Sequence, residues 1–275
     1  MNYDLSGVID LHVHTYPDIQ PRLLDDIQAV EAAKSACMRA LLIKSHEVLT
    51  ADRATIAEKV VGGIRVFGGL VLNQSVGGYN IHAVETAIQL GAKIVWMPTH
   101  NAQNMSYWTG NKGGLSVLDD AGAVLPEVYE ILDLIHQANI AIATGHLSIE
   151  ESVALVRLAK SMGMQKIIVT HPESTLIRMP VEIQQELCGP GVFFERCFFD
   201  TIPTRNPGTT IEEISNHIRI TGVDSTFLST DLGQPQNPPP VEGMSVYLAS
   251  LYEFGFSVGE ITQMTSQIPA FLMDL

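Results

Sequence analysis

The feature that most constrains the fold of this chain is a regular alternation of short apolar runs with amphipathic stretches. Eight apolar runs lie at 8–13, 39–45, 65–72, 92–98, 139–145, 166–171, 191–198 and 225–230. Continuous apolar runs of this length are typical of strands that are buried on both faces, as in a parallel sheet. Eight strand-then-helix units within 275 residues predict a (β/α)8 TIM barrel that forms a single domain over residues 1–275. An open, doubly wound sheet is the alternative, but the glycine fingerprint GxGxxG is missing after the first run.

The amphipathic stretches between the runs predict the helices. The clearest of them lie at 24–37, 126–138, 148–163 and 209–222. Ser148 with Glu151, and Thr210 with Glu213, have the spacing of a capping box, which satisfies the first backbone N–H groups of a helix. We therefore expect two of these helices to begin at Ser148 and Thr210.

Two predicted loops are long for connections between a strand and a helix. The first spans 99–125 and contains a predicted small hairpin that turns at the DDAG segment, 119–122. The second spans 231–244 and contains three consecutive prolines, which favour a preset conformation. Loops of this length in compact domains often form lids or binding walls.

The composition of the chain limits the classes of binding partner and the cellular compartments that we expect. The chain has 30 acidic and 16 basic residues, and its net charge of −14 argues against nucleic acid or an anionic membrane as a partner. A stretch of about 18 uncharged apolar residues is absent, as is a secretory leader pattern. The three cysteines lack CxxC spacing, which indicates a reducing compartment and argues against a thiolate zinc site. We expect a cytoplasmic protein with a small-molecule substrate that forms a homo-oligomer through apolar outer helices and its Phe- and Met-rich C-terminal stretch.

Metal-ligating side chains stand at the ends of four of the predicted strands. His12 and His14 end the first run, and residues two apart in a strand project to the same face. His146, His171 and Asp231 follow the fifth, sixth and eighth runs. The active sites of (β/α)8 enzymes lie at this carboxyl-terminal rim, and neutral imidazole is a good ligand for zinc, iron or manganese. These five residues therefore predict a site for one or two divalent metal ions.

The order of these residues resembles that of the amidohydrolase superfamily of metal-dependent hydrolases. The phrases ATGHLS, VTHPES and STDLGQPQNPPPVEG, and the ending SQIPAFLMDL, are similar to those of a poorly characterised amidohydrolase-like branch. The resemblance implies that His12, His14 and Asp231 hold the more buried metal. It implies that His146 and His171 hold a second metal or polarise the substrate, and that Asp231 acts as the general base.

One position departs from that family. Many binuclear members bridge their two metals with a carbamylated lysine or a glutamate from strand four, whereas here Lys93 lies at the opposite end of that strand. Lys44, near the end of strand two, could replace it as a carbamate, could contact the substrate or a metal-bound water, or could be a buried cation paired with Asp231 or Asp10. We count Lys44 with Asp231 and His171 among the candidate catalytic residues.

The remaining polar residues near the predicted rim are candidates for substrate binding. They are His46, His100, Glu195, Arg178 and Arg205. Glu195 could reach the inner rim or pair with Arg196 or Arg205, and the two arginines Arg178 and Arg205 could anchor a substrate carboxylate or phosphate.

These residues together predict a metal-dependent hydrolase that attacks an amide, lactone or ester of a small molecule with an activated water. Three alternatives remain open at this point. They are a phosphoesterase of the histidinol-phosphatase type, a metal-dependent decarboxylase, and a metal-binding scaffold without catalysis. Asp231 separates the last of these from the enzymes, because binding alone does not need a base at that position.

Overall fold

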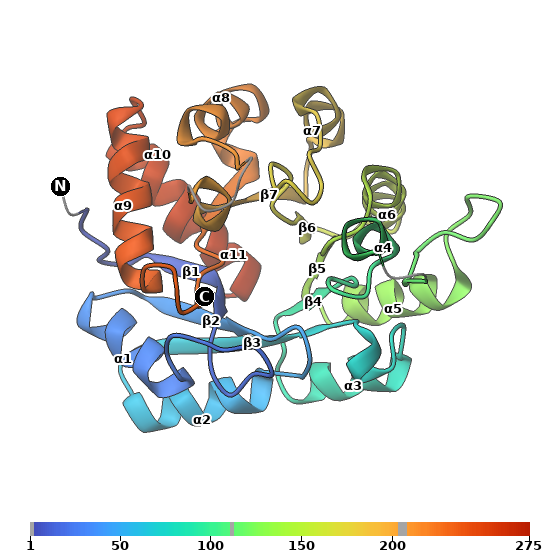
Figure 1. Cartoon of the computed structure of the whole chain (residues 1–275), viewed down its shortest axis with the longest axis horizontal. Coiled ribbons are helices and arrows are strands. Elements are labelled where there is room, and N and C mark those ends of the chain that lie inside the picture. Colours follow the sequence, from blue (N-terminus) through green and yellow to red (C-terminus); the bar gives the residue numbers. More distant parts are fainter. Residues whose placement is uncertain (1–2, 111–112, 203–207) are drawn as a thin grey trace.

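Eight parallel strands form one sheet in the order β1 to β8, as the computed structural model of the chain shows (Figure 1). The structure describes residues 3–110, 113–202 and 208–275. The strands are β1 (Ile9–His14), β2 (Ala40–Lys44), β3 (Arg65–Val71), β4 (Ile94–Trp96), β5 (Ala141–Ala143), β6 (Ile167–Val169), β7 (Val192–Cys197) and β8 (Thr226–Ser229). Seven of them lie within an apolar run of the sequence, and β1 extends one residue beyond its run to His14, so the predicted (β/α)8 barrel is confirmed.

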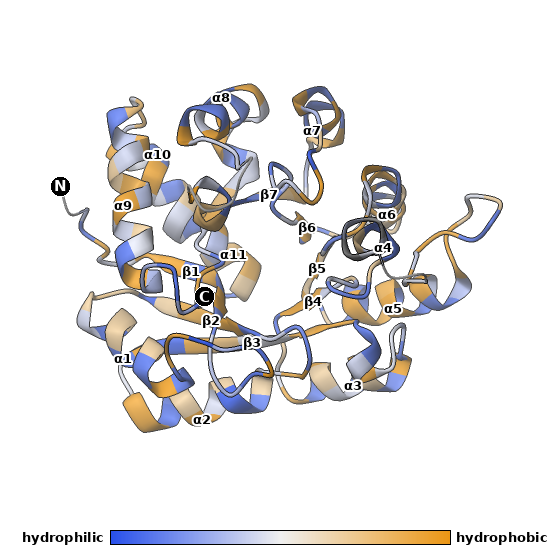
Figure 2. Cartoon of the chain, in the orientation of Figure 1, coloured by the Kyte–Doolittle hydropathy of each residue, from blue (hydrophilic) through white to orange (hydrophobic). Residues whose placement is uncertain are grey.

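Helices surround the sheet, and apolar and polar residues alternate along them (Figure 2). They are α1 (Asp26–Ser35), α2 (Ala51–Val61), α3 (Ile81–Gln89), α4 (Gln103–Thr109), α5 (Pro126–Gln137), α6 (Ile149–Ser161), α7 (Val181–Leu187), α8 (Ile211–Thr221), α9 (Pro240–Glu253), α10 (Val258–Thr262) and α11 (Ile268–Met273). The 3-10 turns η1 (Gln74–Val76), η2 (Phe198–Thr201) and η3 (Val223–Ser225) lie between strands and helices, and the π-helical segment η4 (Gln263–Gln267) joins α10 to α11. Within the described residues, every helix is too short or too polar to cross a membrane.

The last helix closes the amino end of the barrel. Ile268 and Leu272 of α11 belong to the same buried cluster as Leu11 and Trp96 of the strands. Asp274, which follows α11, forms ion pairs with lysines that precede β4 and β6. Part of the apolar C-terminal stretch is therefore used inside the molecule, while Phe271 on the same helix is half exposed.

The barrel closes between β1 and the residues that follow β8. The backbone N–H of Asp231 donates to the carbonyl of His12 (2.9 Å), and the N–H of His14 donates to the carbonyl of Leu232 (2.8 Å). The carboxylate of Asp10 accepts hydrogen bonds from the Thr230 N–H (3.1 Å) and hydroxyl (2.6 Å). We call these contacts the seam, and the HxH pair lies within it.

The predicted local details are partly confirmed. Ser148 and Glu151 form a full capping box at the start of α6. Thr210 accepts the N–H of Glu213, but the carboxylate of Glu213 accepts the hydroxyl of Thr209 instead of closing the box. A small hairpin forms around residues 119–122, with a bridge between residues 118 and 124. The α4 helix ahead of it was not predicted.

Candidate metal centre

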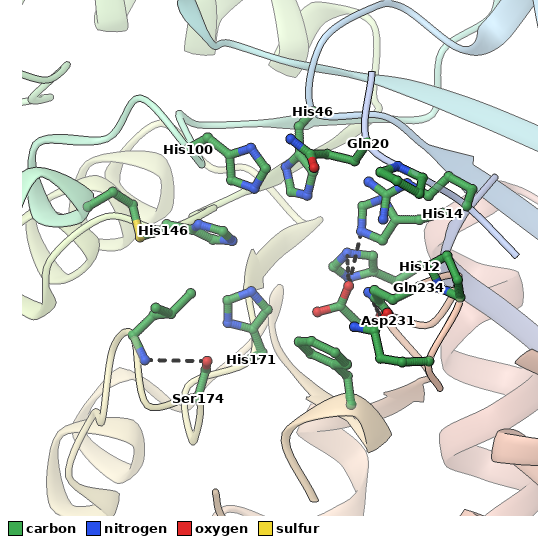
Figure 3. A pocket seen from close by; sticks show the side chains of 17 residues that line it. His12, His14, Gln20, His46, His100, His146, His171, Ser174, Asp231 and Gln234 are labelled. Carbon is green, nitrogen blue, oxygen red and sulfur yellow. Dashed lines mark hydrogen bonds and ion pairs between the residues drawn. The ribbon is translucent and has the colours of Figure 1, made fainter. Parts of the chain in front are cut away.

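Six histidines line one cavity at the carboxyl end of the barrel (Figure 3). The cavity measures about 590 Å³. Its histidines are His12, His14, His46, His100, His146 and His171, and Asp231 lies among them. The sequence analysis selected all seven of these residues, and the structure brings them together.

His12, His14 and Asp231 converge on one carboxylate oxygen. Asp231 Oδ1 lies 3.1 Å from His12 Nε2 and 3.0 Å from His14 Nε2. The two rings stand 5.1 Å apart and are inclined by 62°. Asp231 has a positive φ of 54°. The loop continues through Gly233, whose missing side chain lets the backbone pass directly against the carbonyl of His14.

The opposite nitrogen of each ring fixes its tautomer. His12 Nδ1 lies 3.1 Å from Glu195 Oε1, and His14 Nδ1 lies 3.1 Å from the carbonyl oxygen of Lys44. Because a carboxylate and a carbonyl only accept, both Nδ1 atoms carry the proton. Both Nε2 atoms therefore face the oxygen of Asp231, and each offers its lone pair when the ring is neutral. Burial acts to lower the pKa of His12, but Asp231 and Glu195 raise it to about 9, so a metal ion would have to displace the proton on its Nε2.

That arrangement fits a cation. Burial lowers the pKa of His14 to about 3, although Asp231 acts to raise it, so the ring is neutral at pH 7. Burial acts to raise the pKa of Asp231, but His12 and His14 hold it well below its usual value, so it is ionised. A neutral nitrogen lone pair 3.0 Å from a carboxylate oxygen is repulsive unless a positive ion lies between them. Two imidazoles and a carboxylate, each ring held by a hydrogen bond on its far side, are a typical donor set for a divalent metal.

Glu195 holds His12 from behind and does not line the cavity. Its side chain is almost fully buried at 2% exposure, and His12 helps to keep its pKa low against the effect of burial. Glu195, predicted as a substrate-binding residue, thus lies on the Nδ1 side of His12 and is not among the residues that line the cavity. Asp10, two residues before His12 on β1, accepts the backbone N–H of His12 (3.2 Å).

Lys44 reaches the same nitrogen that the metal would use. Its Nζ lies 2.9 Å from His12 Nε2 and stands over the ring of Trp96 at 4.8 Å from the centroid. Burial lowers the pKa of its amine. Lys44 thus contacts His12, and it lies behind the cavity wall rather than on it.

Cys197, which the sequence did not single out, lies near the same histidine. The ligand atoms of Cys197, His12 and Asp231 lie within 4.8 Å of one another. The thiol is 4.0 Å from His12 Nδ1, whereas Asp231 approaches Nε2. Cys197 therefore lies near the Nδ1 edge of the ring, whereas Asp231 approaches the Nε2 edge.

His146 and His171 form a second imidazole pair across the cavity. Their rings are 5.1 Å apart, and the Nδ1 atom of each is buried without a hydrogen-bond partner among the described residues. Burial lowers the pKa of His171 to about 4 and that of His146 well below its usual value, so both rings are neutral. His171 has a positive φ of 26°, a strained conformation that clusters at functional sites.

His46 presents an N–H to the cavity rather than a lone pair. Asn73 Nδ2 donates to Thr99 Oγ1 (2.7 Å), which leaves the Thr99 hydroxyl to donate to His46 Nδ1 (2.8 Å). The amide of Asn73 is itself oriented, because its Oδ1 accepts the N–H groups of Thr99 and Asn101. In the neutral ring the proton is then on Nε2. His100 stacks on His46 with centroids 3.8 Å apart.

Of the two predicted arginines, the structure describes Arg178 alone. Arg178 is exposed on the loop after β6 and is not among the residues that line the cavity. Arg205 lies outside the described residues. Arg22, which follows β1, does line the cavity and was missed. No periodic pattern marks its loop, and the contact depends on the seam between the two ends of the barrel.

Comparisons with solved structures place this barrel beside known hydrolases. The alignment with an organophosphorus hydrolase from Deinococcus radiodurans covers 98% of this chain and 93% of that protein, with 14% identity and a TM-score of 0.62. An amidohydrolase from Pseudomonas aeruginosa gives 14% identity, coverage of 98% and 95%, and a TM-score of 0.65. The probable dipeptidase PvdM from Pseudomonas aeruginosa is 10% identical, the alignment covers 97% of this chain and 94% of that protein, and the TM-score is 0.63. The resemblance to amidohydrolase-like barrels is thus confirmed at the level of the fold.

The sequence itself matches one family model. No curated protein matches the chain. The model of DUF6282, described as a family of unknown function, matches residues 7–195, which include the four ligand candidates from His12 to His171 but not Asp231. The match spans more than half of the sequence. The chain belongs to the DUF6282 family.

Proposed function

We propose that this protein is a metal-dependent hydrolase that acts on an amide, lactone or ester of a small molecule. The observation that carries the proposal is the pair of imidazoles whose Nδ1 atoms are fixed by acceptors and whose Nε2 atoms both face Asp231 Oδ1. This donor set calls for a cation at the position where (β/α)8 enzymes carry out their chemistry.

His12, His14 and Asp231 would hold the first divalent ion, which is zinc, iron or manganese. His146 and His171, with Nδ1 atoms that lack partners, would complete its coordination or hold a second ion. When bound, such an ion supplies Lewis acidity and makes a water molecule nucleophilic at neutral pH. The absence of a lysine or acidic residue from β4 at the cavity wall favours one ion over a bridged pair.

The residues of the chain would divide the remaining work. Asp231, ionised and at the cavity wall, accepts the proton of the attacking water and passes it to the leaving group. The N–H of His46 and the neutral ring of His171 face the same space and can orient the carbonyl oxygen of the substrate. Lys44 and Glu195 act on His12 and set its position.

The solved neighbours support a hydrolytic reaction, since their names describe an organophosphorus hydrolase, an amidohydrolase and a probable dipeptidase. Because the identities are 10–14%, these names define the range of substrates to test and do not select one. A screen should therefore include lactones, amides and phosphoesters.

The first experiment is metal analysis of the purified protein by mass spectrometry. We expect one to two equivalents of zinc, iron or manganese in the wild type, and loss of most of it in His12→Ala/His14→Ala. A matched control is His82→Ala/His136→Ala, which removes two exposed histidines from α3 and α5. Unchanged metal content in the first variant would falsify the assignment of the site.

We also propose that the protein is cytoplasmic and a homo-oligomer. The acidic composition and the half-exposed apolar residues Tyr252, Phe254 and Val258 near the end of α9 support this. Light scattering tests it, because a mass of 30.0 kDa would show a monomer.

A further inference from the structure

The wall of the cavity is divided between apolar and polar residues. Met105, Leu176 and Phe199 form apolar wall, and Gln20, Gln236 and Arg22 form polar wall beside the histidines. Among the described residues that line the cavity, Arg22 is the one with a permanent positive charge. A substrate for this cavity needs an apolar part and a group that complements Arg22.

Arg22 is buried and only partly paired. Its side chain is 5% exposed, and its Nε and Nη2 atoms each lie 2.9 Å from the same oxygen, Oδ2, of Asp18. A guanidinium group has five N–H donors. No described residue accepts a hydrogen bond from Nη1, so its two donors remain for a ligand in the cavity.

Asp18 fixes the direction of Arg22. Its other oxygen, Oδ1, accepts the backbone N–H of Gln20 (3.1 Å), and its side chain is 1% exposed. The loop is tied to the seam by the N–H of Leu23, which donates to the carbonyl of Gly233 (2.8 Å). Arg22 is therefore held in place beside the metal ligands, where its charge adds to burial in lowering the pKa of His14.

We propose that Arg22 binds a carboxylate of the substrate, so that the substrate of this site is a small carboxylic acid with an apolar side group. This inference rests on the proposed function for the nature of the reaction, but the binding step does not depend on turnover. A carboxylate fits better than a phosphate dianion, because Asp18 already offsets part of the charge of Arg22 and the whole chain carries a net charge of −14. Planar pairing of guanidinium with carboxylate also gives directed, charge-assisted hydrogen bonds.

The test measures binding with a matched pair of probes, N-acetyl-leucine and N-acetyl-leucinamide. Isothermal titration calorimetry is done on the zinc-loaded and on the metal-free protein, so that binding of a carboxylate to zinc is separated from binding to Arg22. We expect the acid to bind about 10- to 100-fold more tightly than the amide to the wild type, the range that a charge-assisted hydrogen bond provides. We expect Arg22→Gln to remove this preference in both forms of the protein.

Three control variants and one folding check make the result interpretable. Arg157→Gln removes an exposed arginine that is also ion-paired, with Glu186, and it should keep the preference. Asp18→Asn/Arg22→Gln removes both charges, so a lost preference there cannot come from repulsion by an unpaired Asp18. Circular dichroism verifies that the variants are folded, and Arg22→Lys, which keeps the charge, should retain part of the preference.

Equal or absent binding of the two probes to the wild type would overturn the inference. So would a preference that survives in the double variant, or a phosphonate analogue that binds through Arg22 more tightly than the acid. Loss of the preference in Arg22→Gln, with no hydrolysis of any screened substrate, would leave the carboxylate site standing and count against the proposed function alone.

Discussion

At the scale of single residues, two groups that can only accept hydrogen bonds determine which ring nitrogens of the site are available to a metal ion. Glu195 Oε1 and the carbonyl of Lys44 fix the protons of His12 and His14, and this makes the Nε2 atoms ligands. The sequence could predict His12 and His14, because a strand places alternate residues on one face. It could not predict that Glu195 lies behind His12, since alternation gives the face of a residue but not its depth along the barrel.

Asp231→Asn keeps the shape of the side chain and one oxygen ligand but removes the proton acceptor. We expect near-normal folding, retention of part of the metal, and a loss of turnover of at least about 100-fold on a substrate found in the screen. Steady-state kinetics of the metal-loaded variant measure this. Turnover at the wild-type rate would show that Asp231 is not the base.

Glu195→Gln tests the support of His12 without touching the cavity wall. An amide can present its NH₂ group to Nδ1, so the proton of the ring is no longer fixed on Nδ1. We expect metal affinity to fall by about 10- to 100-fold, the usual effect of losing such a partner. Titration against a chromophoric chelator gives the affinity, with Glu58→Gln, from a surface ion pair with Arg65, as the control. An unchanged metal affinity would show that Glu195 does not support metal binding by His12.

At the scale of elements, the eight strands could be predicted because each is an apolar run buried on both faces. The α4 helix could not, because its sequence QNMSYWT is short and Ala102, the N-cap residue before it, makes no side-chain cap. The position of Arg22 was missed for a related reason: its loop has no periodic pattern, and a hydrogen bond to residue 233 holds it in place. These loop contacts are made with residues that are far away in the sequence, so a local sequence pattern does not reveal them.

The capping box of α6 gives a prediction at this scale. The Ser148 hydroxyl accepts the Glu151 N–H (3.2 Å), while the Glu151 carboxylate accepts the N–H groups of Ser148 (2.9 Å) and Val117 (3.2 Å). Ser148→Ala removes the first of these bonds and should lower the free energy of unfolding by about 0.5–2 kcal/mol. Urea denaturation measures it. Ser161→Ala, at the exposed end of the same helix, should change it little, and equal effects would contradict the capping role.

At the scale of the whole molecule, the metal ligands join the two ends of the sheet. His12 and His14 belong to β1, and Asp231 follows β8, so an ion held by all three links the strands across the seam. The family match ends at residue 195, so the carboxylate comes from the part of the chain beyond it.

Metal should therefore stabilise the whole barrel. Binding to the folded state alone adds about 4 kcal/mol when the free metal exceeds its Kd by about 1,000-fold. We expect the Tm to rise on adding metal and to fall on adding a chelator, as differential scanning calorimetry measures. In His12→Ala/His14→Ala the Tm should not respond to metal, and an equal response there would place the stabilising ion elsewhere.

The seam also sets the order in which this protein can be completed during synthesis. While the ribosome has made only the residues up to β7, β1 has β2 on one side and an open edge on the other. The nascent chain then contains His12 and His14 but lacks the carboxylate that follows β8. An exposed strand edge invites pairing with other chains, so the nascent barrel is vulnerable to aggregation until residues 230–232 leave the exit tunnel. Closure of the barrel and assembly of the three ligands thus occur together, late in the synthesis of each molecule.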